Sequence, residues 1–163
     1  MKNLEEYNRY KYVVENIKDI IWEMDTNFIF TYVSSSTKEA LGYEKNEVVG
    51  KCMFDLLTIE SKEQVLYTWK SRLSNNDKSK VNLYETQFLC KDGSTIWLEV
   101  SVKPIIEENR RIRYIGVSRD ISEKKVYENE LKKYVDELKN TNEKLRESEE
   151  KFRQLFENMT NGF

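Results

Sequence analysis

The sequence predicts an α+β domain followed by a long charged helix, and three observations support this prediction. Two β-rich runs occur near residue 30 and three more over 81–122, with short helical patterns between the two groups. The turn Lys91-Asp92-Gly93 separates the two most regular runs. Residues 123–153 hold nine basic and nine acidic residues and no Gly or Pro. We therefore expect a five-stranded antiparallel sheet with short helices on one face, a helix before it and a long helix after it.

The chain opens with an amphipathic pattern. Aromatic and aliphatic residues recur at intervals of three and four, which is the period of a helix with one apolar face. These residues are Tyr7, Tyr10, Val13, Val14 and Ile17. We expect this N-terminal helix within residues 1–19, with the periodic pattern over 4–19.

Two strands and three helices are predicted next. "IIWEMD" and "FIFTYV" are separated by Asp25-Thr26-Asn27, which indicates a β-hairpin. Two short helices follow, with Gly42 and Gly50 as their C-caps, and a longer helix spans 60–73.

The last part of the domain contains three strands. The Asp-Gly turn is flanked by two β-rich runs, "VNLYETQFLC" (81–90) and "STIWLEVSVKPI" (94–105). Asp-Gly indicates a tight hairpin here, because such a turn needs a residue that tolerates positive φ. "RRIRYIGVSRDIS" (110–122) is the fifth strand. Together these elements define a domain over 20–122.

The long helix carries a heptad pattern typical of a coiled coil. Leucine or phenylalanine recurs every seven residues at the d positions, and the a positions include one valine and one asparagine. We expect a parallel two-stranded coiled coil over 123–150 that joins two copies of the chain, with the N-terminal helix as a second candidate contact. The alternative is a single amphipathic helix packed on its own domain. The predicted dimer seam consists of Leu131, Val135, Leu138, Asn142, Leu145 and Phe152.

The end of the chain repeats a pattern from its beginning. "LFENM" (155–159) aligns with "VVENI" (13–17), with Glu-Asn in the same register and apolar residues on both sides. We expect residues 151–163 to be the truncated start of a second unit of the same kind.

Composition argues against several classes of function. The net charge of −2 does not favour nucleic-acid binding, and no apolar run is long enough for a membrane span or a signal peptide, so we expect a cytoplasmic protein. With no histidine and only two distant cysteines, Cys52 and Cys90, the sequence predicts no metal site. No catalytic residue is predicted either, because no nucleophile–base pair is recognisable.

The junction between the last strand and the long helix contains a capping motif. Asp120 is followed three residues later by Glu123, the spacing of a capping box. We expect the Asp120 carboxylate to accept amide hydrogens of the first helical turn while Glu123 reaches back. A structural cap and a signal-transmitting junction are both consistent with this pattern.

Three segments of the sequence resemble the PAS family of sensor domains. They are "TYVSSSTKEALGYEKNEVVGKCMFDLL", "KDGSTIWLEVSVKPI" and "YIGVSRDISEKK". The resemblance implies a sensory module whose last strand leads into a signalling helix, with Asp120, Ile121, Ser122 and Glu123 as relay residues. It also implies a missing output domain in the same polypeptide. A histidine kinase is the first expectation, and a diguanylate cyclase, a chemoreceptor or a cofactor-based redox or light sensor are the alternatives.

The resemblance further implies a ligand pocket between the inner face of the sheet and the short helices. Strand alternation and the opposing helices suggest its lining, although the same residues could simply fill a core. We predict no cofactor, because "GKCMFD" around Cys52 lacks the Asn and Gln of light-sensing flavin relatives and no histidine is present to ligate haem. The predicted pocket residues are Phe30, Tyr32, Ser34, Phe54, Leu57, Tyr67, Ile96, Leu98 and Val100.

Overall fold

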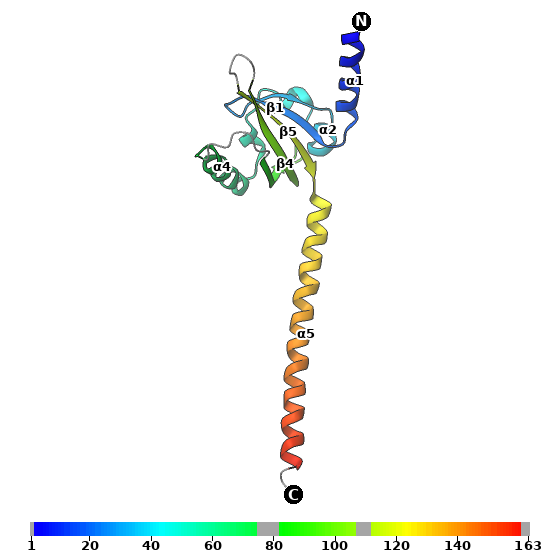
Figure 1. Cartoon of the computed structure of the whole chain (residues 1–163), viewed down its shortest axis with the longest axis vertical. Helices are drawn as coiled ribbons and strands as arrows, with labels where there is room; N and C mark the ends of the chain where they lie inside the picture. The colour runs from blue at the N-terminus through cyan, green and yellow to red at the C-terminus, as the bar shows by residue number, and fades with distance from the viewer. Residues whose placement is uncertain (1, 75–81, 107–111, 161–163) are drawn as a thin grey trace. The chain divides into compact units, whose positions relative to one another are not determined.

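The computed structural model describes residues 2–74, 82–106 and 112–160. The chain divides into two compact units, residues 1–122 and residues 123–163. The first unit holds the sheet and the short helices, and the second holds the long C-terminal helix (Figure 1).

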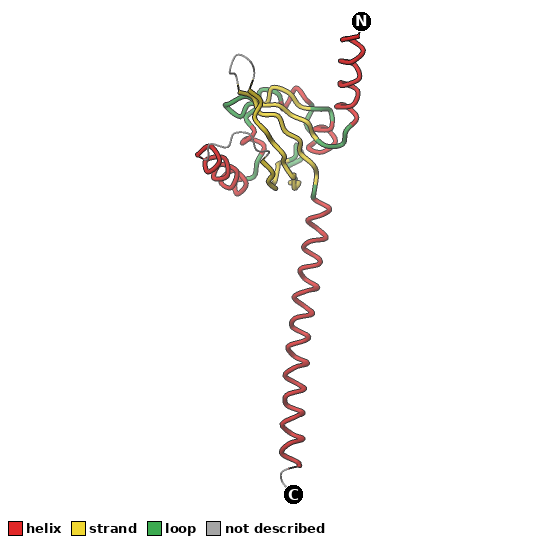
Figure 2. Tube along the Cα trace, in the orientation of Figure 1, coloured by secondary structure: helices red, strands yellow, loops and turns green. Residues whose placement is uncertain are grey.

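The first unit is built on a five-stranded antiparallel sheet in the order β2-β1-β5-β4-β3, drawn in yellow in Figure 2. β1 pairs with both β2 and β5, so the first and last strands of the domain are neighbours. This arrangement confirms the predicted fold, while the predicted strand ends at Val81 and Arg110–Arg111 lie outside the described residues. The strands are β1 (Ile20–Met24), β2 (Phe30–Val33), β3 (Asn82–Leu89), β4 (Thr95–Ile106) and β5 (Ile112–Asp120).

Both predicted hairpins form. In the β3–β4 turn, Gly93 has φ of 85° and Cys90 N–H donates to the Ser94 carbonyl at 2.8 Å. In the β1–β2 turn, the residue with positive φ is Phe28, at 63°, one residue beyond the predicted turn. Asp25 accounts for this shape, because its carboxylate accepts the amide hydrogens of Asn27 and Ile29.

Short helices and one longer helix connect the two halves of the sheet. α2 (Ser36–Leu41) ends at Gly42, as predicted, and α3 (Lys45–Val48) begins with a capping box between Glu44 and Glu47. α3 ends before the predicted cap at Gly50, because the ψ of 129° at Val49 already lies outside the helical region. A 3₁₀ turn, η1 (Met53–Leu56), and α4 (Ile59–Ser74) complete the layer.

The N-terminal helix α1 spans Lys2–Asn16 and is shorter than predicted. Residues 17–19 are not helical, because β1 begins at Ile20 and the chain must become extended before it enters the sheet. Most of the apolar pattern of α1 remains exposed, including Tyr7 at 63% and Tyr10 at 61%.

The hydrophobic core lies between the inner face of the sheet and the helical layer. Alternate residues of β4 are buried on this face, as the sequence predicts for Ile96, Leu98 and Val100, although Ile96 is only partly buried. α4 contributes Val65 and Trp69, which lie one helical turn apart.

The C-terminal helix α5 spans Ser122–Thr160 without interruption. It continues through residues 150 and 151, where the sequence suggested the start of a new unit. The apolar residues of the predicted seam are exposed in this chain, from 40% for Val135 to 72% for Phe152, and Asn142 is exposed as well.

Candidate sensory cavity and helix junction

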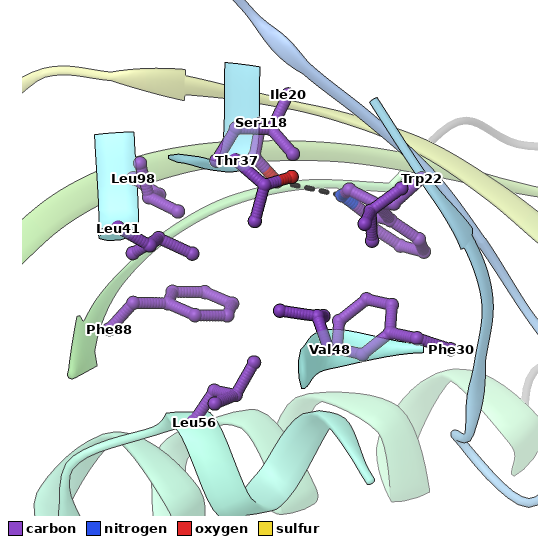
Figure 3. A pocket seen from close by; sticks show the side chains of 11 residues that line it. Ile20, Trp22, Phe30, Thr37, Leu41, Val48, Leu56, Phe88, Leu98 and Ser118 are labelled. Carbon is purple, nitrogen blue, oxygen red and sulfur yellow. Dashed lines mark hydrogen bonds between the residues drawn. The ribbon is translucent and has the colours of Figure 1, made fainter. Parts of the chain in front are cut away.

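A small cavity lies between the sheet and the short helices, at the place where the resemblance implied a ligand pocket (Figure 3). Its volume is about 20 Å³, which is enough for a water molecule and far too small for a metabolite. The cavity is lined by Ile20, Trp22, Phe30, Val33, Thr37, Leu41, Val48, Leu56, Phe88, Leu98 and Ser118.

The Trp22 indole takes up much of the space at this site. Its Nε1–H donates to the Ser118 hydroxyl oxygen at 2.8 Å, the dashed contact in Figure 3. The ring lies against Gly116 of β5, where an added Cβ would come within 2.1 Å of the indole. Phe30 packs on the ring edge-to-face at 5.9 Å between centroids. A tightly packed side chain therefore stands where a ligand would bind.

Of the nine predicted pocket residues, Phe30 and Leu98 line this cavity. Leu57 and Val100 are buried elsewhere in the core, each at 1% exposure. Ser34 is fully buried, but its hydroxyl accepts the Ile21 amide hydrogen at 2.9 Å and lies 2.6 Å from the Ser36 hydroxyl. Ser34 therefore has a local role in holding the end of β2. Two further predicted residues, Phe54 and Ile96, are partly buried beside the core.

The placement of Tyr32 and Tyr67 in the pocket is wrong. A β-bulge shifts the register between β1 and β2, so Met24 pairs with Phe30 whereas Glu23 pairs with Tyr32. This extra residue turns Tyr32 to the outer face, where it is 37% exposed. Tyr67 is 76% exposed, because it lies on the side of α4 opposite the one that packs on the sheet.

Sequence reasoning missed the central residue of the site, Trp22. A signal was present, because Ile20, Trp22 and Met24 alternate along β1 and all three are buried. The contact with Gly116 could not be inferred, since it depends on the pairing of β1 with β5, strands at opposite ends of the domain sequence.

The junction before α5 is held by three hydrogen bonds, two of them to the backbone of Trp97 in β4. Asp120 Oδ1 accepts the Ser122 amide hydrogen at 2.8 Å, as the capping prediction requires. Ile121 N–H donates to the Trp97 carbonyl at 2.9 Å, and Trp97 N–H donates to the Ser122 hydroxyl at 3.0 Å. Ile121 is also buried, at 6% exposure. The end of β5 and the first residue of α5 are therefore anchored to the neighbouring strand.

The predicted role of Glu123 in a capping box is wrong. Its carboxylate accepts a hydrogen bond from the Tyr127 hydroxyl at 3.2 Å, one turn further along α5. The reason is the position of the helix start. α5 begins at Ser122, so Asp120 lies two residues before the helix and not at the N-cap position that a capping box requires.

Glu15 fastens α1 to the domain. Its carboxylate accepts two hydrogen bonds from Lys45 Nζ at 2.6 and 2.7 Å, one from the Ser35 amide at 3.2 Å and one from the Tyr32 hydroxyl at 3.3 Å. The interactions with Lys45, the largest cause, and with Ser35 lower the pKa of Glu15 from 4.5 to about 2.

Glu15→Gln is expected to destabilise the domain by about 1.5–3 kcal/mol at neutral pH, the usual range for hydrogen bonds to a charged group. Because the pKa of Glu15 is lowered on folding, its contribution is complete above pH 4.5 and is lost as the pH falls towards about 2. Urea denaturation of both proteins across this range should show their stabilities converging in acid. Glu5→Gln, at an exposed position of α1, is the control, and an equal effect of the two substitutions would contradict this role for Glu15.

No group of three or more potential metal ligands occurs among the described residues. Within the same ranges, no helix is long and apolar enough to cross a membrane.

Two curated relatives resemble this chain over more than half of its length. The methyl sulfide methyltransferase-associated sensor of Methanosarcina acetivorans is 30% identical over 128 residues, which are 76% of this chain and 12% of that protein. The blue-light photoreceptor of Listeria monocytogenes is 28% identical over 101 residues, which are 61% of this chain and 38% of that protein. The chain thus spans only a minor part of the length of these relatives.

Solved structures share the fold. The PAS domain of an HTR-like protein from Haloarcula marismortui is 28% identical with a TM-score of 0.61, covering 74% of this chain and 96% of that one. A PAS domain from a two-component sensor histidine kinase, 18% identical with a TM-score of 0.59, covers 74% of this chain and 99% of that one. The PAS domain family model matches residues 18–123. This chain therefore belongs to the PAS domain family.

Proposed function

We propose that this chain is the sensory and dimerisation module of a larger cytoplasmic signalling protein. It forms a homodimer through α5, and α5 passes the signal to an output domain in the same polypeptide. That output domain is a histidine kinase, with a diguanylate cyclase or a chemoreceptor as the alternative. The curated relatives support a sensory role, because one is named a sensor and another a photoreceptor.

The observation that carries this proposal is the direct passage from β5 into α5. β5 ends at Asp120 and α5 begins at Ser122, so a single residue separates strand from helix. The helix then runs for 39 residues with an exposed apolar stripe at heptad spacing. A rigid helix that starts at an anchored strand end can transmit a small change in the sheet. In the proposed dimer, α5 of one copy would then shift or rotate against α5 of the other copy.

The size of the inner cavity supports a domain without a cofactor. At about 20 Å³ the cavity does not accommodate a flavin or a haem. The alternative of a cofactor-based redox or light sensor rests on the similarity to the blue-light photoreceptor. It would require Trp22 and its neighbours to repack.

Asp120→Ala tests the relay. In a chimera that joins this chain through α5 to a histidine kinase catalytic core, we expect autophosphorylation to change by about fivefold, the equivalent of about 1 kcal/mol for a lost cap. The physical reason is that the Ser122 amide loses its acceptor, which loosens the junction while the core of the domain is untouched. The assay is the initial rate of autophosphorylation, with circular dichroism to confirm folding.

Asp120→Asn is the matched control, because its side-chain oxygen can still accept the Ser122 amide hydrogen. A folded Asp120→Ala chimera with unchanged activity would mean that the junction is only a structural cap.

A further inference from the structure

Four aromatic rings pack together where the β1–β2 turn meets the helical layer, and none of them lines the inner cavity. Phe28 lies edge-to-face with Phe54 of η1 at 5.2 Å and with Trp69 of α4 at 5.0 Å between centroids. Its ring is within 4° of parallel to Tyr114 of β5, at 6.2 Å. Trp69 also contacts Tyr114 edge-to-face at 4.9 Å. Phe54, Trp69 and Tyr114 thus form an aromatic box that the Phe28 ring occupies.

Phe28 has a backbone conformation that is unfavourable for phenylalanine. Its φ of 63° makes it the one non-glycine residue with positive φ in the described ranges. Two backbone hydrogen bonds hold the turn in this shape: Phe28 N–H donates to the Asp25 carbonyl at 3.1 Å, and the Phe28 carbonyl accepts from Met53 N–H at 2.9 Å. Glycine or asparagine would meet the same requirement at lower steric cost. The ring contacts in the aromatic box therefore have to offset the strain of this residue.

One wall of the box, Trp69, carries a buried polar group without a partner among the described residues. Trp69 is 6% exposed, and its indole Nε1–H has no hydrogen-bond partner within the described part of the chain. A buried donor without an acceptor is unfavourable, and a phenyl ring cannot supply a conventional acceptor. A molecule of similar shape that carried an acceptor would remove this penalty.

We propose that the aromatic box is a binding site for a small planar aromatic molecule with a hydrogen-bond acceptor, and that Phe28 occupies it as an internal competitor. Two features favour exchange. Withdrawal of the ring lets the backbone at Phe28 relax, and the incoming acceptor satisfies Trp69 Nε1. The contacts of the Phe28 ring oppose exchange. The apparent affinity of the unmodified chain is therefore reduced in proportion to the small fraction of molecules in which the ring has left the box. This inference concerns the first unit alone and holds whether or not α5 forms a dimer.

Phe28→Gly opens the box, because it removes the ring and tolerates the positive φ. We would titrate this variant and the unmodified chain with 4-methylpyridine and with toluene, following the Trp and Tyr signals by NMR at mildly alkaline pH. The two probes have nearly the same shape, but only 4-methylpyridine carries an acceptor. We expect Phe28→Gly to bind 4-methylpyridine about tenfold more tightly than toluene, and about tenfold more tightly than the unmodified chain does.

Trp69→Phe in the Phe28→Gly background is the control, because it keeps an aromatic ring and removes the N–H donor. We expect the preference for 4-methylpyridine over toluene to disappear in this double variant. Absence of binding to a folded Phe28→Gly protein, or equal binding of both probes to it, would overturn the proposal. Should the glycine variant fail to fold, Phe28→Ala is used with the same criteria.

Discussion

Replacing Leu138 by Glu is expected to raise the dissociation constant of the proposed dimer at least about a hundredfold. Leu138 is 63% exposed in the single chain and occupies a d position, so in a parallel coiled coil both copies would bury it in the seam. Burial of a leucine side chain contributes about 1.5–3 kcal/mol, and two copies are lost per dimer. Two carboxylates would also face each other across an apolar seam, which adds a desolvation cost. Sedimentation equilibrium of the purified chain measures the change directly.

The control for this substitution is Asn140→Glu. It introduces the same charge only two residues away, at an outward-facing f position, and leaves the seam intact. Leu145→Glu, one heptad further along, should reproduce the effect of Leu138→Glu. If Leu138→Glu stays as dimeric as the unmodified chain, the seam has been assigned to the wrong face of α5. The circular dichroism of the first unit should remain unchanged, because the described residues of its core all lie outside α5.

Gly116→Ala is expected to destabilise the first unit by about 3 kcal/mol, the upper part of the range for overpacked cores. The added Cβ would lie 2.1–2.5 Å from three atoms of the Trp22 indole, a distance that no side chain tolerates. The indole cannot move away easily, because its Nε1–H is bonded to the Ser118 hydroxyl and Phe30 packs on its ring. Urea denaturation monitored by circular dichroism gives the free energy of unfolding.

Two comparisons identify the cause. Val117→Ala, at the next and outward-facing position of β5, should cost far less, because Val117 is 38% exposed. Trp22→Phe removes the indole atoms that Gly116 contacts, so Gly116→Ala should cost at least about 1 kcal/mol less in that background than alone. Additive effects of the two substitutions would show that Trp22 does not pack against Gly116.

The strands, hairpins and helices of this protein were largely predictable, because each depends on residues that are close together in the sequence. The alternation of Leu98 and Val100 placed the inner face of β4, and Gly93 and Gly42 marked a turn and a helix end. The strand–helix junction at Asp120 was also recognisable, since a cap is formed by neighbouring residues.

The composition of the candidate site was decided by the tertiary structure. Strand alternation assumes uninterrupted pairing, and the β-bulge opposite Glu23 turned Tyr32 away from the pocket that it was predicted to line. The Glu15–Lys45 contact and the packing of Trp22 on Gly116 join residues that are distant along the chain. The sequence alone therefore determined the α+β architecture and the position of the long C-terminal helix, through local periodicity and turn chemistry. Only the folded sheet decided that an indole fills the inner site, because that depends on which strands become neighbours.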